Sequence, residues 1–552
     1  MNSSFNIHSW SYFAVLTLIA MSIPLSKFAM SNFEFLLLFL WLLSGFSFTI
    51  SYRFFKLGGF FKGIFHFFKY FFTLAANNFV DKFSLFFKNK PAVVLSSIFL
   101  IHILGLFYTS DFTYAIKDMR VKLPLLLFPV VISTMPRITY KQFRVMIYFY
   151  IAAVFVGSII SLVYIIKAEF VDIREVSPFI SSVRFSLNVS FAFFALLYFM
   201  FFDSSIKIWQ RIGFGLLATW FVVFLVLLES VTGLGIVIAI IIVLVVRQAF
   251  QSKSYVGKIA ILLIAIAIPL SLFIYIRSVV ISVSTAPEVD FSTLDQFTAK
   301  GNPYLHDTTY RGIEDGRYIG LFINYDELRE EWNKRSKLDF DALVNGNYSL
   351  QETLIRYMTS KNLRKDAEGL KAMTNYDIKM VEKGIANYNY NKNPGIKVRI
   401  MKVLLGYEVY KETGDPSGSS VMQRYEYSKA SLALIKRNFW LGVGTGDLED
   451  ALIEEYKDMG SELKNQYLFH AHNQFIAFFI TFGIFGFLWF FFALIYPPVK
   501  EGYFNDYFYL VFFLIMVFSM LSDDTLETQA GATLFAFFMT FLLFGRKTKN
   551  SF

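Results

Sequence analysis

Long apolar runs separated by short polar turns form the main pattern of the chain. A membrane-spanning helix needs about 20 mostly apolar residues. The run at 121–136 is short and bounded by Pro124, Pro129 and Pro136, so we expect it to be kinked or to span only in part. The pattern predicts an all-α polytopic membrane protein with about twelve transmembrane helices, at 10–30, 33–51, 91–109, 121–136, 143–166, 184–202, 209–228, 232–250, 257–280, 471–496, 506–522 and 529–545.

One stretch, 281–469, has a different pattern. It is polar, contains turn signals such as Asn393-Pro394-Gly395, and carries helical stretches at 326–337 and 350–371. Its length is large enough for a folded domain. The pattern therefore predicts an N-terminal membrane region (1–280), a large, mainly helical domain (281–469) between the ninth and tenth spans, and a C-terminal membrane region (470–552).

Two segments near the N-terminus need separate interpretation. The first predicted span lacks a small-residue cleavage site and leads directly into the second, so we expect an uncleaved anchor. Segment 54–90 repeats phenylalanine with lysine, as in Phe67-Phe68-Lys69. This repeat predicts an amphipathic helix lying on the inner leaflet, with a re-entrant helix as the alternative.

Composition narrows the class of protein. Apolar residues make up 55% of the chain and charged residues 17%, which excludes a disordered, fibrous or ordinary soluble protein. The absence of cysteine excludes a disulfide scaffold, a CxxC redox site and a cysteine–zinc site. The net charge of +10 divides into −3 for 281–469 and +13 for the rest, which indicates membrane topology and anionic lipid as partners, not nucleic acid.

The distribution of lysine and arginine predicts the orientation. With the N-terminus in the cytoplasm, the inner loops hold 19 of the 27 basic residues outside 281–469, including Lys88, Lys90, Arg137 and Lys500. We therefore expect a multi-pass protein of the cell inner membrane with both termini in the cytoplasm. The polar domain and the outer ends of the spans then face the periplasm.

A histidine pair stands at the outer start of the tenth predicted span, in the sequence His470-Ala471-His472-Asn473. A neutral imidazole can accept a proton near physiological pH, and Asn473 can orient it or bind a sugar hydroxyl. The alternative is a pair of interfacial histidines at a helix start. A metal pair is less favoured, because residues i and i+2 do not share a helix face and no third ligand is evident.

Four cations lie on the predicted outer side, against the general distribution of charge. Arginine suits a diphosphate because its fork binds two oxygens, so Arg120, Lys122, Arg184 and Arg424 are candidate anion ligands. The alternatives are interfacial snorkelling for the first three and, for Arg424, a salt bridge with Glu426 or another acid.

Other motifs add little chemistry. The pair Asp523-Asp524 lies in a predicted outer loop and could bind a divalent metal or act as acid and base, but a solvated turn is the favoured interpretation. Nucleotide-binding, GxSxG and HExxH motifs are absent from the sequence, and the run 442–446 (GVGTG) is interpreted as a turn.

The chain resembles the O-antigen ligase family of polytopic inner-membrane glycosyltransferases, which is related to O-antigen polymerases. His472, Asn473, Gly483 and Gly486 match that family's motif without a gap. The run 438–446, the long polar loop and the segment Asp118–Pro129 are also similar to the family. One departure is Ser230-Val231-Thr232-Gly233, where members often carry an arginine in place of Val231.

The resemblance implies a metal-independent, inverting glycosyltransferase without a cofactor. Its donor would be a glycan on undecaprenyl diphosphate, and its acceptor a sugar hydroxyl of the lipid A core. By the same resemblance His472 is the general base on that hydroxyl, while Arg120, Arg184 and Arg424 stabilise the charge of the departing diphosphate.

Three other functions remain open at this point. An O-antigen polymerase or a protein O-oligosaccharyltransferase would use the same donor, and sequence separates these poorly. A polysaccharide flippase or transporter would show inverted repeats or charges near the bilayer midplane. The sequence has no evident duplication, and its charges lie at the outer rim.

Overall fold

The computed structural model describes residues 7–46, 48–167, 177–251, 254–286, 288–310, 312–344, 348–392, 396–468 and 471–547. This part of the chain is mostly helical and contains two short β-hairpins. It divides into two compact units, Met1–Leu244 with Gln423–Phe552, and Val245–Met422. The predicted boundaries at 280 and 470 lie elsewhere and stay predictions, as does the periplasmic location of the polar segment.

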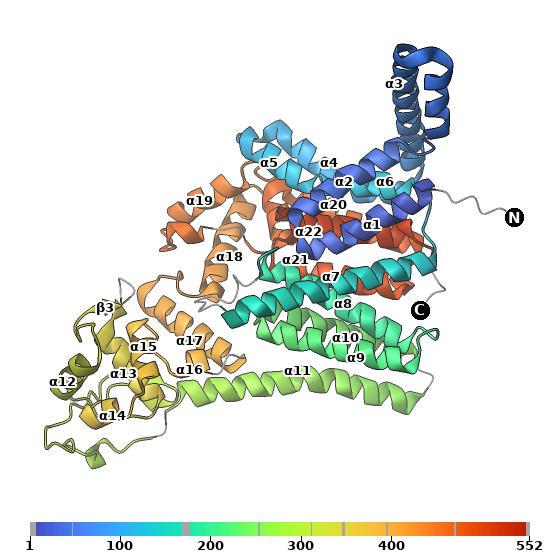
Figure 1. Ribbon diagram of the computed structural model, residues 1–552. Coiled ribbons are helices and arrows are strands. Elements are labelled where there is room, and N and C mark those ends of the chain that lie inside the picture. The colour runs from blue at the N-terminus through green and yellow to red at the C-terminus, as the bar shows by residue number, and fades with distance from the viewer. Residues whose placement is uncertain are drawn as a thin grey trace. The chain divides into compact units, whose positions relative to one another are not determined.

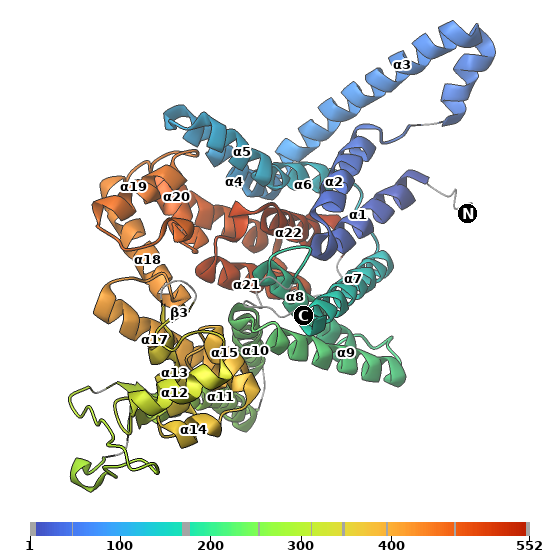
Figure 2. The ribbon, with the colours of Figure 1, turned by 60° about the vertical axis from the view of Figure 1, so that its left-hand side comes forward.

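The first unit is built from apolar helices (Figures 1 and 2). Helix α1 packs against α2 and α7, α4 packs against α6 and α20, α8 packs against α9 and α21, and α22 packs against α6. The bounds are α1 (Ile7–Leu25), α2 (Lys27–Leu42), α3 (Phe48–Lys88), α4 (Lys90–Gly105), α5 (Phe112–Lys122), α6 (Pro124–Ser133), α7 (Tyr140–Lys167), α8 (Ser182–Phe201), α9 (Ile208–Leu227), α10 (Val231–Gln251), α18 (Ser420–Arg437), α19 (Leu448–Asp458), α20 (Gln474–Glu501), α21 (Tyr507–Ser522) and α22 (Gln529–Thr540).

Aromatic side chains fill the centre of this unit. The ring of Phe191 on α8 lies 5.0 Å from that of Phe512 on α21 and 4.9 Å from that of Phe538 on α22, with all distances between centroids. All three rings are fully buried. Edge-on contacts of this kind stabilise aromatic clusters beyond the effect of burial alone, and here they hold together the helices that carry the candidate site.

Eight of the described helices are long and apolar enough to cross a membrane: α1, α4, α7, α8, α9, α10, α11 and α20. The expectation of about twelve spans is thus met only in part. At 1.5 Å per residue, α6 is only about 15 Å long, because Pro124 begins it and it ends at Ser133. Helix α2 ends before a turn in which Gly45 has a φ of +83°, a break that hydropathy does not reveal. The apolar helices α21 and α22 are also shorter than a full span.

The phenylalanine–lysine segment forms one helix, α3, of 41 residues. The Asn78 side chain donates hydrogen bonds to the carbonyl oxygens of Leu42 and Ser44, at 2.7 and 2.9 Å, and thereby fixes α3 to the turn after α2. Phe61, Phe65 and other rings of α3 are exposed. The predicted helix is therefore present, and its location on the inner leaflet stays a prediction.

The second unit has its own core around Trp332, Leu354 and Met358, which are fully buried. Asp315 and Gly316 join β1 to β2 with positive φ angles of 50° and 73°, as a tight two-residue hairpin requires. The bounds are α11 (Tyr255–Ser284), β1 (Ile313–Glu314), β2 (Arg317–Tyr318), α12 (Tyr325–Arg335), β3 (Leu343–Val344), β4 (Tyr348–Ser349), α13 (Leu350–Ser360), α14 (Ala367–Lys371), α15 (Asn375–Glu382), α16 (Asn389–Lys392) and α17 (Ile396–Thr413).

Candidate active site

The start of α20 positions the histidine motif. Asn473 has an extended backbone, and its Oδ1 accepts hydrogen bonds from the amides of Phe475 and Ile476 at 3.0 and 3.1 Å, so it is the N-cap of α20. Its Nδ2 donates to the carbonyl oxygen of Leu521 at 3.0 Å. His472 directly precedes this cap and has a φ of +48°. A non-glycine residue in the left-handed region carries strain that is common at functional sites.

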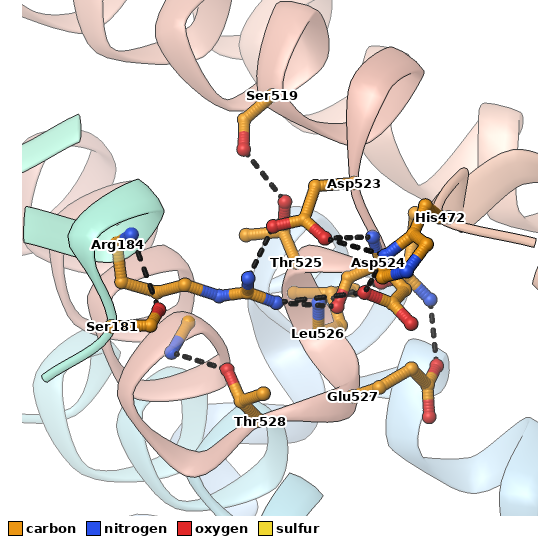
Figure 3. A network of polar contacts seen from close by, with 12 residues as sticks. Ser181, Arg184, His472, Ser519, Asp523, Asp524, Thr525, Leu526, Glu527 and Thr528 are labelled. Atoms are coloured by element: carbon orange, nitrogen blue, oxygen red, sulfur yellow. Dashed lines mark hydrogen bonds and ion pairs between the residues drawn. The ribbon is translucent and has the colours of Figure 1, made fainter. Parts of the chain in front are cut away.

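The turn between α21 and α22 lies against His472 (Figure 3). Nδ1 of His472 is 3.4 Å from Oδ1 of Asp523 and 3.7 Å from Oδ1 of Asp524. Asp523 is 4% exposed, so its interpretation as part of a solvated turn is wrong. Burial of this carboxylate requires compensating positive charge.

Arg184 of α8 supplies that charge from the other side of the same acids. Its Nη1 forms an ion pair with Oδ2 of Asp523, while Nη2 donates to the Asp524 carbonyl oxygen at 3.1 Å. Figure 3 shows the two carboxylates between the guanidinium and the imidazole. The structure thus joins two residues predicted from sequence, Arg184 and His472, through a third element of the chain.

These contacts change the proton affinity of the imidazole. Burial disfavours its charged form, but hydrogen bonds to Asp523 and Asp524 and their negative charge outweigh this effect and raise the pKa of His472 to about 9. In this state the ring is therefore protonated at neutral pH. The sequence alone suggested an ordinary pKa near 6.5, because the acids lie 51 residues further along the chain.

Lys122 belongs to a second buried charge group beside the first. Its Nζ lies 2.9 Å from Oδ2 of Asp118 and 2.6 Å from Oε2 of Glu527. Gln474 donates to Oε1 of Glu527 at 2.8 Å, and its own Oε1 accepts from the Leu526 amide at 2.6 Å. Snorkelling, the alternative for Lys122 and Arg184, is wrong because both charged heads are buried against carboxylates.

Two of the predicted cations remain exposed. Arg424 on α18 lies one turn before Tyr427, whose ring centroid is 5.6 Å from that of His472. Glu426 pairs with Lys429 at 2.8 Å, and among the described residues no salt bridge joins Arg424 to Glu426 or to another acid. Within the described residues neither Arg120 nor Arg424 has an ion pair. His470 lies outside the described residues.

The motif glycine Gly483 interrupts α20 with a φ of 62° and a ψ of −166°. A Cβ there would lie 2.2 Å from the carbonyl oxygen of Trp440. Through this break the amide of Ile484 donates to Phe439, while the carbonyls of Ile480 and Thr481 accept from 443 and 444 at 2.9 Å. The glycine is thus needed for docking of the run 438–444 against α20.

His472, Asp523 and Asp524 also have the spacing of a cation site, since one ligand atom from each lies within 4.8 Å of the others. Nitrogen and carboxylate oxygen donors would suit a divalent transition metal. Arg184, however, already neutralises Asp523, and the donors are held by hydrogen bonds within the protein.

Residues 373–491 match the model of a family described as O-antigen ligase. The match includes His472, Asn473, Gly483 and Gly486, and it excludes Lys122, Arg184 and the acidic turn. It supports a membrane glycosyltransferase of the O-antigen ligase or polymerase type. No curated protein matches the chain. The resemblance found in the sequence is therefore confirmed.

Proposed function

Because residues 373–491 match the O-antigen ligase family, we propose that the protein transfers a glycan from undecaprenyl diphosphate to a sugar hydroxyl of the lipid A core. The reaction takes place at the periplasmic face of the inner membrane and inverts the anomeric centre. The observation that supports this function best is a partly exposed imidazole held by two carboxylates, which Arg184 contacts from their other side.

His472 is the general base. Its Nδ1 faces the acids, so we assign Nε2 to the substrate. The acceptor oxygen forms a bond to the anomeric carbon, the bond from that carbon to the diphosphate oxygen breaks, and the hydroxyl proton passes to Nε2. Asp523 and Asp524 stabilise the resulting imidazolium, as the acid of a serine-hydrolase triad does. The same acids hold the proton in the resting state, so the neutral base is a minor form at pH 7.

The diphosphate leaves with its charge stabilised by cations. In the buried cluster, the three cations Lys122, Arg184 and protonated His472 are outnumbered by four carboxylates: Asp118, Asp523, Asp524 and Glu527. This cluster alone cannot attract an anion. We therefore assign the direct contacts to Arg120 and Arg424, which are exposed, and a supporting role to Lys122 and Arg184. Asn473 and His470 are the candidate sugar contacts.

Deletion of the gene in its host tests the function. Loss of the whole lipopolysaccharide ladder, with accumulation of lipid-linked glycan, identifies a ligase. Single-repeat caps identify a polymerase, and a normal ladder with unglycosylated proteins identifies a protein-directed transferase. Complementation with the His472→Asn variant should not restore the ladder. Asparagine is the sharper substitution, because it tolerates the left-handed backbone at this position.

A further inference from the structure

The end of α20 opposite His472 carries an unexplained group of like charges. A cavity of about 360 Å³ is lined by Lys88, Asn89, Lys90, Pro91, Arg137, Lys500, Glu501 and Phe544. Four of these residues are cations and only one is an acid. They come from the α3–α4 junction, the linker after α6, the end of α20 and the C-terminal turn after α22.

The cations are not neutralised by the protein. Among the described residues, none of these four side chains forms an ion pair, and Glu501 pairs with none of them. All four are exposed. Converging like charges repel one another, and the N-terminus of α4 adds a partial positive charge at Lys90. An anion in the cavity would relieve this repulsion.

The cavity is separate from the candidate active site. Helix α20 has 28 residues and runs from Gln474, next to His472, to Glu501. It is not straight, because the break at Gly483 folds its two parts together, so that the ring centroids of Phe478 and Phe490 are only 4.1 Å apart. None of the residues that line the cavity belongs to the candidate active site. The four lining cations are among the residues that the charge distribution predicts on the cytoplasmic face.

The surroundings of the cavity favour a lipid over a soluble anion. Phe87 directly precedes Lys88 and is 62% exposed, and Val499 directly precedes Lys500 and is 60% exposed. Apolar surface next to a basic pocket suits acyl chains below a phosphate headgroup, and basic pockets between helices on the cytoplasmic side commonly bind such headgroups. The volume is also within the range of small-ligand sites.

We propose that this cavity binds the phosphate headgroup of an anionic phospholipid of the inner leaflet. The cations contact the phosphate, Phe544 and Pro91 form an apolar wall, and the acyl chains follow Phe87 and Val499. Bound lipid then connects the ends of α4 and α20, two helices that pack against each other.

Titration of the purified full-length protein in detergent with fluorescent phosphatidylglycerol tests this site. The variant Lys90→Gln/Arg137→Gln/Lys500→Gln should bind on the order of 100-fold more weakly, because each cation near a membrane surface contributes about fivefold. A control variant, Lys62→Gln/Lys69→Gln/Lys141→Gln, removes three exposed cations of the same predicted face outside the cavity. It should bind within about twofold of the wild type, since it leaves the contacts unchanged.

A second variant distinguishes the loss of a lipid contact from a folding defect. Glu501→Gln removes the lining carboxylate and should tighten phosphatidylglycerol binding about fivefold, an increase that misfolding cannot produce. Phosphatidylethanolamine and inorganic diphosphate serve as competitors, and neither should displace the probe at equal concentration. Equal affinities of the triple variant and its control would overturn the proposal. Displacement of the fluorescent lipid by inorganic diphosphate would show that the cavity binds a soluble anion and not a lipid, and it would also overturn the proposal.

Discussion

The two ends of α20 use the same residue types in opposite ways. At the His472 end, Lys122 and Arg184 are buried, and each lies against two carboxylates. At the Lys500 end, four cations are exposed and unpaired among the described residues. Removal of a charge from water requires a local counter-ion, whereas an exposed charge keeps its hydration. Lys122 and Arg184 are therefore fixed in place by the protein, whereas the four cations at the Lys500 end remain available to a ligand.

The largest expected effect concerns the base at the first end. His472→Asn should lower glycan transfer by about 10²- to 10⁴-fold, the usual contribution of general-base catalysis, and leave membrane insertion intact. Transfer is measured with lipid-linked glycan and lipid A-core acceptor in proteoliposomes. His66→Asn, at an exposed position of α3, is the matched control and should retain full activity. Wild-type transfer by the His472 variant would refute the assignment.

The second prediction compares one lysine from each end. Lys122→Met leaves Asp118 and Glu527 buried together, so it should lower the free energy of unfolding by about 3–5 kcal/mol. Lys500→Met removes an exposed charge from a repulsive group and should change stability by no more than about 0.5 kcal/mol. Unfolding by SDS titration without added phospholipid measures both. Equal losses would contradict the contrast between the two ends.

The third prediction is the pH profile of transfer. A base with a pKa of about 9 is neutral in only about 1% of molecules at pH 7. Because only the neutral imidazole accepts a proton, kcat/KM should rise about tenfold per pH unit from pH 7 to 8 and level off above pH 9. Asp523→Asn removes an acid that raises the pKa and should move the half-maximal point to lower pH. A wild-type midpoint below pH 7 would exclude His472 as the titrating base.

The fourth prediction concerns the break between the two ends. Gly483→Ala places a side chain in a backbone region that is essentially restricted to glycine, at a cost of about 1–3 kcal/mol, and against the Trp440 carbonyl. Gly213→Ala in α9 meets no atom within 4 Å and should instead stabilise the helix by about 0.5–1 kcal/mol. The two variants are compared by SDS unfolding, and equal stability would show that the break is not required.

Hydropathy predicted most of the membrane helices because their burial in lipid or protein requires long apolar runs. The eight long helices lie at predicted positions, and α6, α21 and α22 lie within three of the remaining runs. Helix α2 overlaps only the first half of the run 33–51. The predicted stretch 326–337 is α12, whereas the stretch 350–371 is divided into α13 and α14. Helix breaks were harder to predict. The turn after α2 and the interruption at Gly483 depend on φ angles that glycine permits but does not require.

The sequence predicted which residues belong to the site, but it did not predict which of them contact one another. His472 and Asn473 stand in a recognisable motif, and Arg184 was found by its charge on the unexpected side. Their partners Asp523 and Glu527 are more than 50 residues away in sequence from His472 and Gln474, so no local pattern could pair them. The raised pKa of His472 follows only from that pairing.

The smallest expected effect is that of metal removal. EDTA should change transfer by less than about twofold, because a diphosphate is a good leaving group and Arg184 already neutralises Asp523. A cation bound among His472, Asp523 and Asp524 would have to displace that guanidinium and the proton on Nδ1. It would thereby abolish the rise of activity toward pH 9. The EDTA-treated enzyme should therefore keep both its rate and its pH profile. Complete loss of transfer that Mg²⁺ or Mn²⁺ restores would instead identify these three residues as a metal site.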